Sequence, residues 1–267
     1  MSDRIAAALA DHGRRAALMP YLMGGFPDLQ TSRAVGEACA DAGADVVELG
    51  VPFSDPLADG PVIHAAATRA LAAGVTVDDV LGVCEAIAAR LPVVLMVYAN
   101  TVLAGGAERF AARAAEAGAA GIIVPDLPHD EAAEMRAVCD ARGLALVPLV
   151  APTTPENRLA AIGRDARGFV YTVSLAGTTG ERDELAPALT ALVARVRAAA
   201  EPLPVAVGFG IARPEQARAV AQIADGVIVG SRVVRAAGEG GPAAVREVVG
   251  ALADALGQPP AGTRPSR

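Results

Sequence analysis

The stretch DAGADVVELG, residues 41–50, joins the end of an Ala-rich helical pattern to a short apolar strand. Gly43 suits the left-handed conformation that ends many helices, and the β-branched Val46 and Val47 favour an extended strand. The same order of Ala-rich helix, glycine and apolar strand returns in EAGAAGIIV (116–124) and ARGLALV (141–147). The chain therefore alternates helices with strands, and several strands are entered through a helix-ending glycine.

Eight apolar runs carry this alternation along the chain. They are ALMPYL (17–22), DVVELG (45–50), PVVLMVY (92–98), GIIVP (121–125), LALVPLV (144–150), GFVYTV (168–173), PVAVG (204–208) and DGVIVG (225–230). The runs are continuous rather than alternating, which is typical of parallel strands buried on both faces. Eight strand–helix units predict an α/β fold of the (β/α)₈ barrel type, or TIM barrel. A doubly wound open sheet is the alternative, although no G-x-G-x-x-G follows the first strand.

The alternation covers nearly the whole chain, so residues 1–257 are expected to form a single barrel domain. Residues 2–12 are predicted to form an added N-terminal helix that covers the barrel floor. Residues 258–267 are polar and Pro-rich and are predicted to be a frayed tail. Two long connections, 50–75 and 174–190, follow the C-terminal ends of strands, where barrel enzymes keep their chemistry.

Composition excludes several classes of function. The 267 residues carry a net charge of −7, only 3% aromatic residues and no Trp, so the chain lacks the basic surface and stacking rings of nucleic-acid-binding proteins. All 23 basic residues are Arg. Without a Lys amine the chain cannot act as a Schiff-base aldolase, bind pyridoxal phosphate covalently or use a Walker-type phosphate loop. We therefore expect no cofactor in this chain.

The cysteines and histidines point to a reduced protein without a metal site. Cys39, Cys84 and Cys139 are far apart and lie in Ala-rich helical patterns, which is typical of buried thiols in a cytoplasmic protein. The N-terminus lacks the features of a signal peptide, and the apolar runs are too short to span a membrane. The histidines, at positions 12, 64 and 129, are isolated from each other and from carboxylate clusters at ligand spacing.

Four acidic or phenolic side chains at or near strand ends are candidates for proton transfer. Glu48 ends an otherwise apolar strand, where burial would raise its pKa toward neutrality; the alternative is a carboxylate paired with an arginine. Asp55 and Asp59 lie in a loop stiffened by Pro and Gly, and either could instead cap the helix that starts near Pro61. Tyr171 also lies near a strand end, and it could equally be a buried hydroxyl bonded to the backbone.

Glycines after the last strands suggest a phosphate site. Gly208 and Gly210 end the seventh strand, and Gly230 and Ser231 open a short helix after the eighth. Loops after these two strands form the usual phosphate site of barrels, because backbone N–H groups and a helix N-terminus favour an anion. Gly177 and Gly180 could close over the same phosphate. These residues together indicate a lyase or isomerase that acts on a small sugar-phosphate-like substrate by acid–base chemistry.

Several longer motifs resemble those of one family, the tryptophan synthase alpha chain. They are ELGVPFSDPLADGP (48–61), LMVYAN (95–100), YTVSLAGTTG (171–180), GFGI (208–211) and VGS (229–231). The resemblance runs from Pro20 to Ser231. It implies a retro-aldol cleavage of indole-3-glycerol phosphate to indole and glyceraldehyde 3-phosphate, in the last step of tryptophan biosynthesis.

The resemblance also implies roles for individual residues. Glu48 matches the glutamate that transfers protons, Asp59 the aspartate that binds the indole nitrogen, and Tyr171 an assisting tyrosine. The positions expected to bind the substrate are Tyr21, Met96, Tyr98, Ile123 and Phe209 around the indole and glycerol groups, and Thr179, Gly180, Gly210, Gly230 and Ser231 around the phosphate. The sequence departs from the family pattern at Met23, Met96, Leu175 and Ala176, none of which is a proton-transfer position.

A partner follows from the resemblance as well: a pyridoxal-phosphate-dependent beta chain, expected in an α₂β₂ assembly. The family uses the loop with Pro52, Phe53 and Asp55 and the loop 176–190 for this contact. Two alternatives remain, a stand-alone indole-releasing lyase and a catalytically idle barrel that regulates the beta chain. The presence of both Glu48 and Asp59 argues against the idle barrel.

Overall fold

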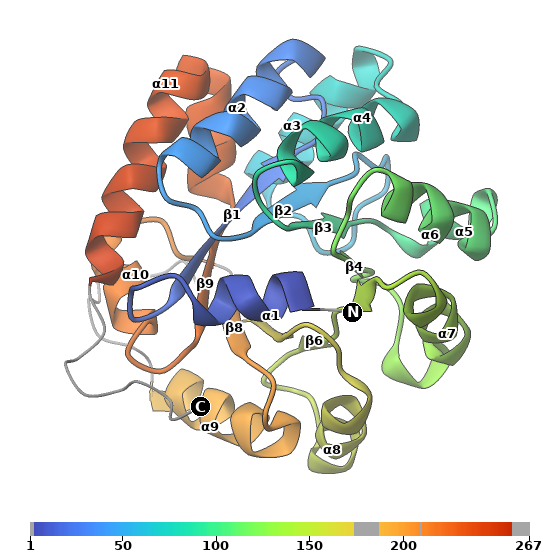
Figure 1. The fold of residues 1–267 in the computed structure, drawn as a ribbon, viewed down its shortest axis with the longest axis vertical. Helices are drawn as coiled ribbons and strands as arrows, with labels where there is room; N and C mark the ends of the chain where they lie inside the picture. Colours follow the sequence, from blue (N-terminus) through green and yellow to red (C-terminus); the bar gives the residue numbers. More distant parts are fainter. Residues whose placement is uncertain (1–2, 174–186, 209, 258–267) are drawn as a thin grey trace.

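The structure, a computed structural model, describes residues 3–173, 187–208 and 210–257, and its nine strands form one parallel sheet in the order β5-β4-β3-β2-β1-β9-β8-β7-β6 (Figure 1). The strands are β1 (Ala17–Met23), β2 (Val47–Gly50), β3 (Val93–Met96), β4 (Gly121–Ile123), β5 (Ala145–Leu146), β6 (Leu149–Val150), β7 (Val170–Val173), β8 (Val205–Gly208) and β9 (Gly226–Val229). The helices are α1 (Asp3–Ala10), α2 (Leu29–Asp41), α3 (Pro61–Ala72), α4 (Val77–Ala88), α5 (Ala99–Ala104), α6 (Ala107–Glu116), the 3₁₀ turn η1 (His129–Glu131), α7 (Ala133–Ala141), α8 (Glu156–Asp165), α9 (Pro187–Ala200), α10 (Pro214–Val220) and α11 (Ser231–Leu256).

The two ends of the strand order lie on one short segment of chain, so the sheet closes into a barrel. β5 pairs with β4, and β6 pairs with β7, with only Val147 and Pro148 between them. The backbone N–H of Val147 still donates to Ile122 O at 2.9 Å, and Pro148 O accepts from Tyr171 N at 3.0 Å. A closed ring of strands confirms the barrel prediction, and the open-sheet alternative is wrong.

The predicted fifth strand, 144–150, differs from expectation because it is divided into β5 and β6. Pro148 stands at the division, and its nitrogen has no hydrogen to donate to a neighbouring strand. Past Val147 the chain leaves β4 and joins β7. The fifth strand is therefore interrupted between β5 and β6, although Val147 and Pro148 keep the ring of strands closed.

Alternation along each strand sorts side chains into the barrel interior or the layer under the helices. In β2 and the residue before it, Val46 belongs to the interior cluster, whereas Val47 and Leu49 pack in the outer layer. Glu48 therefore points into the barrel. Both layers are almost wholly buried, which explains why the strands read as continuous apolar runs.

Helix α1 closes the N-terminal end of the barrel. In Figure 1 it crosses the middle of the ring of strands, while the other helices surround the ring. Its Ile5 and Leu9 are 0% and 4% exposed and belong to the interior cluster. Ile5 lies beside Gly121 and Leu9 beside Gly226, the first residues of β4 and β9. This confirms the expected added helix on the barrel floor.

We expect Ile5→Ala to lower the free energy of unfolding by about 2–4 kcal/mol, because it leaves a cavity that the surrounding strands cannot fill. The matched control is Leu103→Ala, which truncates a side chain that is 64% exposed and should change stability by less than about 0.5 kcal/mol. Urea unfolding of both variants measures the difference. Equal stability of the two variants would show that α1 does not seal the barrel.

The three thiols behave as predicted from the sequence. Cys39, Cys84 and Cys139 are buried and unpaired, and burial raises the pKa of each thiol to about 12. Such thiols stay protonated and unreactive. Within the described ranges, no helix is both long and apolar enough to cross a membrane. The predicted tail, 258–267, lies outside the described residues.

Candidate active site

The predicted site residues gather at the C-terminal ends of seven strands. Those described are Tyr21 (β1), Glu48 (β2), Asp59 (between β2 and α3), Met96 (β3), Tyr98 (the residue before α5), Ile123 (β4), Tyr171 (β7), Gly210 (after β8), and Gly230 and Ser231 (after β9). Thr179, Gly180 and Phe209 lie outside the described residues, as do Gly177, Leu175 and Ala176. Because all the strands are parallel, their C-terminal ends meet at one end of the barrel, opposite α1.

Glu48 is a buried carboxyl group inside the barrel. It is 1% exposed, and within the described part of the chain neither of its carboxyl oxygens has a hydrogen-bond partner. Burial first, and then the neighbouring Asp59 carboxylate, raise the pKa of Glu48 from 4.5 to about 8. The alternative of an arginine-paired carboxylate finds no support in these contacts. At neutral pH this group is largely protonated and can both give and take a proton.

Asp59 is held by a tyrosine and does not cap a helix. Gly60 occupies the N-cap position of α3, and α3 has no side-chain cap. The Asp59 carboxylate instead accepts a hydrogen bond from the Tyr98 hydroxyl at 3.0 Å. The capping interpretation was wrong because the helix begins one residue later than a cap at Asp59 would require. Burial raises the pKa of Asp59, while the Tyr98 hydrogen bond and His64 lower it.

Tyr98 is itself fixed on several sides. Its oxygen accepts from the backbone N–H of Ala58 at 3.0 Å, and its ring stacks on Phe53 with 5.0 Å between centroids. The next residue, Ala99, donates its N–H to Asp126 at 2.8 Å. Burial raises the pKa of Tyr98 to about 12, so the hydroxyl stays protonated and donates a hydrogen bond to Asp59. The loop after β2 is thereby tied to the end of β3.

Two tyrosines each lie against a glycine of the adjacent strand. A Cβ atom at Gly50 would overlap the hydroxyl of Tyr21, and a Cβ atom at Gly208 would overlap the hydroxyl of Tyr171. Glycine is therefore needed at the ends of β2 and β8 so that the two phenol groups can lie at the top of the barrel. Gly208 thus makes room for Tyr171, and its part in a phosphate site stays a prediction.

The same two tyrosines share an electrostatic environment with the carboxyl groups. Burial, Asp59 and Glu48 raise the pKa of Tyr21 well above its usual value. Burial, Glu48 and Tyr21 do the same for the pKa of Tyr171. Both phenols consequently stay neutral donors. The structure thus brings Glu48, Asp59, Tyr21 and Tyr171 within electrostatic reach of one another.

The other side of the barrel end presents backbone suited to an anion. Gly210 has a φ of +80°, a conformation that favours glycine, and Gly230 is the N-cap of α11 with Ser231 as its first residue. Gly241, just before Pro242, is non-helical and divides α11, so the first segment of α11, which begins at Ser231, is the short helix expected after the last strand. N–H groups in its first turn and its dipole favour a phosphate.

Sequence reasoning missed three contributors to the site. Phe53 stacks on Tyr98, Ala58 supplies an N–H group to it, and His64 lowers the pKa of Asp59. All three lie in or next to the loop that carries Asp59, so its length and rigidity were the available signals. Among the described residues, no three His, Cys, Asp or Glu side chains lie together in a way that could hold a metal ion.

The chemistry available at this end of the barrel is acid–base chemistry beside an anion-binding helix end. Glu48 can transfer a proton, Asp59 can accept a hydrogen bond, and Ser231 begins the helix that favours a phosphate. Two carboxyl groups with different surroundings can take different roles, since the more buried one keeps its proton at higher pH.

Comparisons with known proteins agree with this geometry. The profile of the tryptophan synthase alpha chain family matches residues 7–254. The tryptophan synthase alpha chain of Prochlorococcus marinus (strain MIT 9313) is 49% identical over 239 residues, which are 88% of this chain and 86% of the relative. A chain of Mycobacterium tuberculosis tryptophan synthase (space group F222) is 42% identical, with a TM-score of 0.88 over 96% of this chain and 99% of that chain. The tryptophan synthase subunit alpha of Legionella pneumophila str. Paris is 38% identical, with a TM-score of 0.85 over 95% and 98% of the two chains. A barrel with these motifs in this arrangement, matched over nearly its full length, belongs to the tryptophan synthase alpha chain family.

Proposed function

We propose that Glu48 and Asp59 carry the proton transfer and charge stabilisation by which this chain, a carbon–carbon lyase of the tryptophan synthase alpha chain family, cleaves indole-3-glycerol phosphate to indole and glyceraldehyde 3-phosphate. The observation that carries the assignment is the buried, unpartnered Glu48 carboxyl group with a pKa of about 8, close to the Asp59 carboxylate.

Glu48 gives one proton to the substrate and takes another from it, so it ends the reaction protonated. Protonated Glu48 gives its proton to indole C3, which interrupts the aromatic ring and prepares the C3–carbon bond for cleavage. The resulting Glu48 carboxylate then takes the proton from the substrate hydroxyl on the carbon bonded to C3, and this carbon becomes the aldehyde as the bond to C3 breaks. The bonding electrons return to the ring and regenerate indole. A carboxyl group poised near neutral pH serves both steps.

Asp59 and the neighbouring phenols are proposed to stabilise charge in the reaction without transferring a proton. When C3 is protonated, positive charge develops on the indole nitrogen, and the Asp59 carboxylate accepts a hydrogen bond from N1–H. Tyr98 keeps Asp59 in place through its 3.0 Å hydrogen bond. Tyr171 and Tyr21 stay neutral and offer phenol hydroxyls beside Glu48, which can support it while it is ionised.

Gly210, Gly230 and Ser231 are proposed to hold the phosphate, together with Thr179 and Gly180 of the loop after β7. The N-terminus of α11 supports this because it provides N–H donors and a favourable dipole. Met96, Tyr98, Ile123 and Phe209 are proposed to surround the indole and glycerol groups. Met96 packs against both the interior cluster and the cluster around Tyr21 and Met23, so it lies between the barrel interior and the site.

The partner is proposed to be a tryptophan synthase beta chain in an α₂β₂ assembly, with pyridoxal phosphate bound only by the beta chain. The exposed Leu57 and Leu103, 85% and 64% exposed, support a contact surface here. They follow β2 and β3 at the end of the barrel that carries Glu48. The protein is proposed to be located in the cytoplasm, which the free thiols and the biosynthetic reaction support.

The test is indole release from indole-3-glycerol phosphate by the purified chain, with and without a beta chain. We expect measurable indole release by the chain alone and faster indole release when the beta chain is added. An equal rate in both cases would favour the stand-alone lyase. No release in either case, from a chain with normal circular dichroism, would favour the idle barrel and overturn the proposal.

Tyr98→Phe should lower kcat/KM about ten-fold and move its acidic limb to higher pH. The variant keeps the ring stacked on Phe53 but loses the hydroxyl that lowers the pKa of Asp59. A neutral-to-charged hydrogen bond of this kind is worth about 1.5–3 kcal/mol. The measurement is kcat/KM against pH, with Asp59 required in its ionised form. An acidic limb that stays in place would mean that Tyr98 does not hold Asp59.

A further inference from the structure

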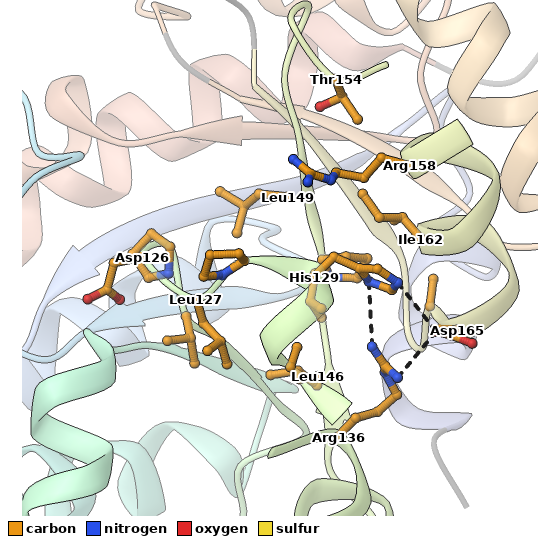
Figure 2. A pocket seen from close by; sticks show the side chains of 17 residues that line it. Asp126, Leu127, His129, Arg136, Leu146, Leu149, Thr154, Arg158, Ile162 and Asp165 are labelled. Carbon is orange, nitrogen blue, oxygen red and sulfur yellow. Dashed lines mark hydrogen bonds and ion pairs between the residues drawn. The ribbon is translucent and has the colours of Figure 1, made fainter. Parts of the chain in front are cut away.

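A cavity lies between helices α7 and α8, and residues 124–128, which follow the C-terminal end of β4, form part of its wall. We call it the α7–α8 pocket, because it opens between these helices over the interruption between β5 and β6 (Figure 2). Its volume is about 370 Å³, which lies within the range of small-molecule sites. None of the described residues predicted to bind substrate lines it.

The interruption of the fifth strand explains the apolar floor of this pocket. Leu146, the last residue of β5, is only partly buried and packs against the outer layer of the barrel. Leu149, the first residue of β6, also lines the pocket, but its side chain packs against the interior cluster. Ile162 from α8 and the rings of Pro125 and Pro128 complete the apolar wall. A flat or branched apolar group can displace water from such a surface with a favourable free energy.

One end of the pocket carries hydrogen-bond donors. Figure 2 shows Thr154 and Arg158 at the same end, with Leu149 and Ile162 beside them. The Thr154 hydroxyl oxygen accepts from Ala151 N at 3.1 Å, so its own hydrogen can be donated elsewhere. Arg158 pairs with Asp130 at 2.7 Å, but their side chains are 48% and 62% exposed. Such a surface pair contributes little, so the guanidinium can turn to a ligand carboxylate.

The opposite end is closed by a cluster in which a basic and an acidic side chain neutralise each other. Arg136 lies 3.2 Å from Asp165, His129 Nε2 lies 3.4 Å from the same carboxylate, and Arg136 contacts His129 Nδ1 at 3.5 Å. These contacts join α7 and the turn before it to the end of α8. Asp126 and Asp165 balance Arg136 and Arg158 in the lining, so a monoanion leaves less uncompensated charge in the pocket than a dianion such as phosphate.

We propose that the α7–α8 pocket is an accessory binding site for a small monocarboxylate with an aromatic or branched aliphatic body. The body lies on Leu146, Ile162 and the ring of Pro128, and the carboxylate accepts from Arg158 and Thr154. This site is distinct from the proton-transfer groups, because none of Glu48, Asp59 and Tyr171 lines it.

The test uses phenylacetate as the probe and methyl NMR of the full chain as the readout. Ile162 reports on the α7–α8 pocket, and Ile123 reports on the catalytic end. We expect saturable shifts of the Ile162 and Leu146 methyl signals with a dissociation constant of about 1 mM, and an unchanged Ile123 signal. Phenylacetamide, which has the same ring without the charge, should bind at least about ten-fold more weakly.

Two variants on the same helix separate the carboxylate contact from a general charge effect. Arg158→Gln should weaken phenylacetate binding at least about ten-fold, since it removes the charged donor. Arg164→Gln removes the same charge from an exposed position of α8 outside the pocket and should bind like the wild type. Equal affinity of the two variants, equal affinity for the amide, or no Ile162 shift up to about 10 mM phenylacetate would each overturn the proposal. A shift of Ile123 alone would place the probe in the catalytic end and overturn it as well.

Discussion

Glu48→Gln is expected to lower the rate of indole-3-glycerol phosphate cleavage by at least about 10²–10⁴-fold, the usual contribution of a general acid–base group. Glutamine keeps the size and polarity of the side chain, but it can neither give a proton to indole C3 nor take one from the hydroxyl. The effect should fall on kcat. Phosphate contacts are proposed to come from Gly210, Gly230 and Ser231, so substrate binding should persist.

Single-turnover cleavage with saturating enzyme measures this effect apart from binding. Titration with glycerol phosphate is the control: an unchanged affinity shows that the proposed phosphate site of the variant is intact. Near-normal turnover by Glu48→Gln would mean that another group transfers the proton. The wild-type chain should also lose kcat/KM as the pH rises through about 8, because the reaction begins from protonated Glu48.

The same substitution should change how stability depends on pH. Folded Glu48 keeps its proton up to about pH 8, whereas the unfolded chain loses it near pH 4.5. The folded wild type therefore loses stability as the pH rises through this window, by up to about 1.4 kcal/mol per pH unit. Glu48→Gln lacks this loss, so its stability advantage should grow until about pH 8 and then level off. Urea unfolding across this range provides the measurement, and parallel stability curves would contradict the raised pKa.

Asp59→Asn is expected to lower cleavage by about 10²–10³-fold while the chain stays folded. The Asn side-chain oxygen can still accept the Tyr98 hydrogen bond. It carries no negative charge to stabilise the developing positive charge on the indole nitrogen. Because Asp59 caps no helix, the free energy of unfolding should change by less than about 1 kcal/mol.

Asp55→Asn is the matched control in the same loop. Asp55 is exposed and pairs with Ser54, so the loss of its charge should leave the cleavage rate of the isolated chain within about two-fold. Cleavage rates and urea midpoints of the two variants are compared directly. If Asp59→Asn unfolded early but cleaved normally while folded, Asp59 would have a structural role only.

The barrel and its proton-transfer carboxyl group could be predicted from the sequence because both leave a local signature. Strands covered on both faces must be apolar at every position, so the runs near Val47 and Val227 are visible without any knowledge of their neighbours. Glu48 interrupts one of these runs. A carboxyl group in such a strand is buried wherever the strand is buried, and its raised pKa follows from desolvation.

The partner of Asp59 could not be predicted in the same way. Tyr98 reaches it from 39 residues further along the chain, and the choice between helix cap and tyrosine contact depends on where α3 begins. Sequence spacing allowed both interpretations. Only the placement of β3 beside β2 brought the phenol to the carboxylate.

Sequence alone thus determined which segments form the barrel and which carboxyl group lies within it, because burial acts on each strand by itself. Tertiary structure alone decided the contacts between strands: the space that Gly50 and Gly208 leave for the two tyrosines, and the interruption at Pro148 that opens the α7–α8 pocket. These features depend on the register of neighbouring strands and on how far adjacent helices stand apart. Such distances arise from packing between residues far apart in the chain, for which no single segment carries a signal.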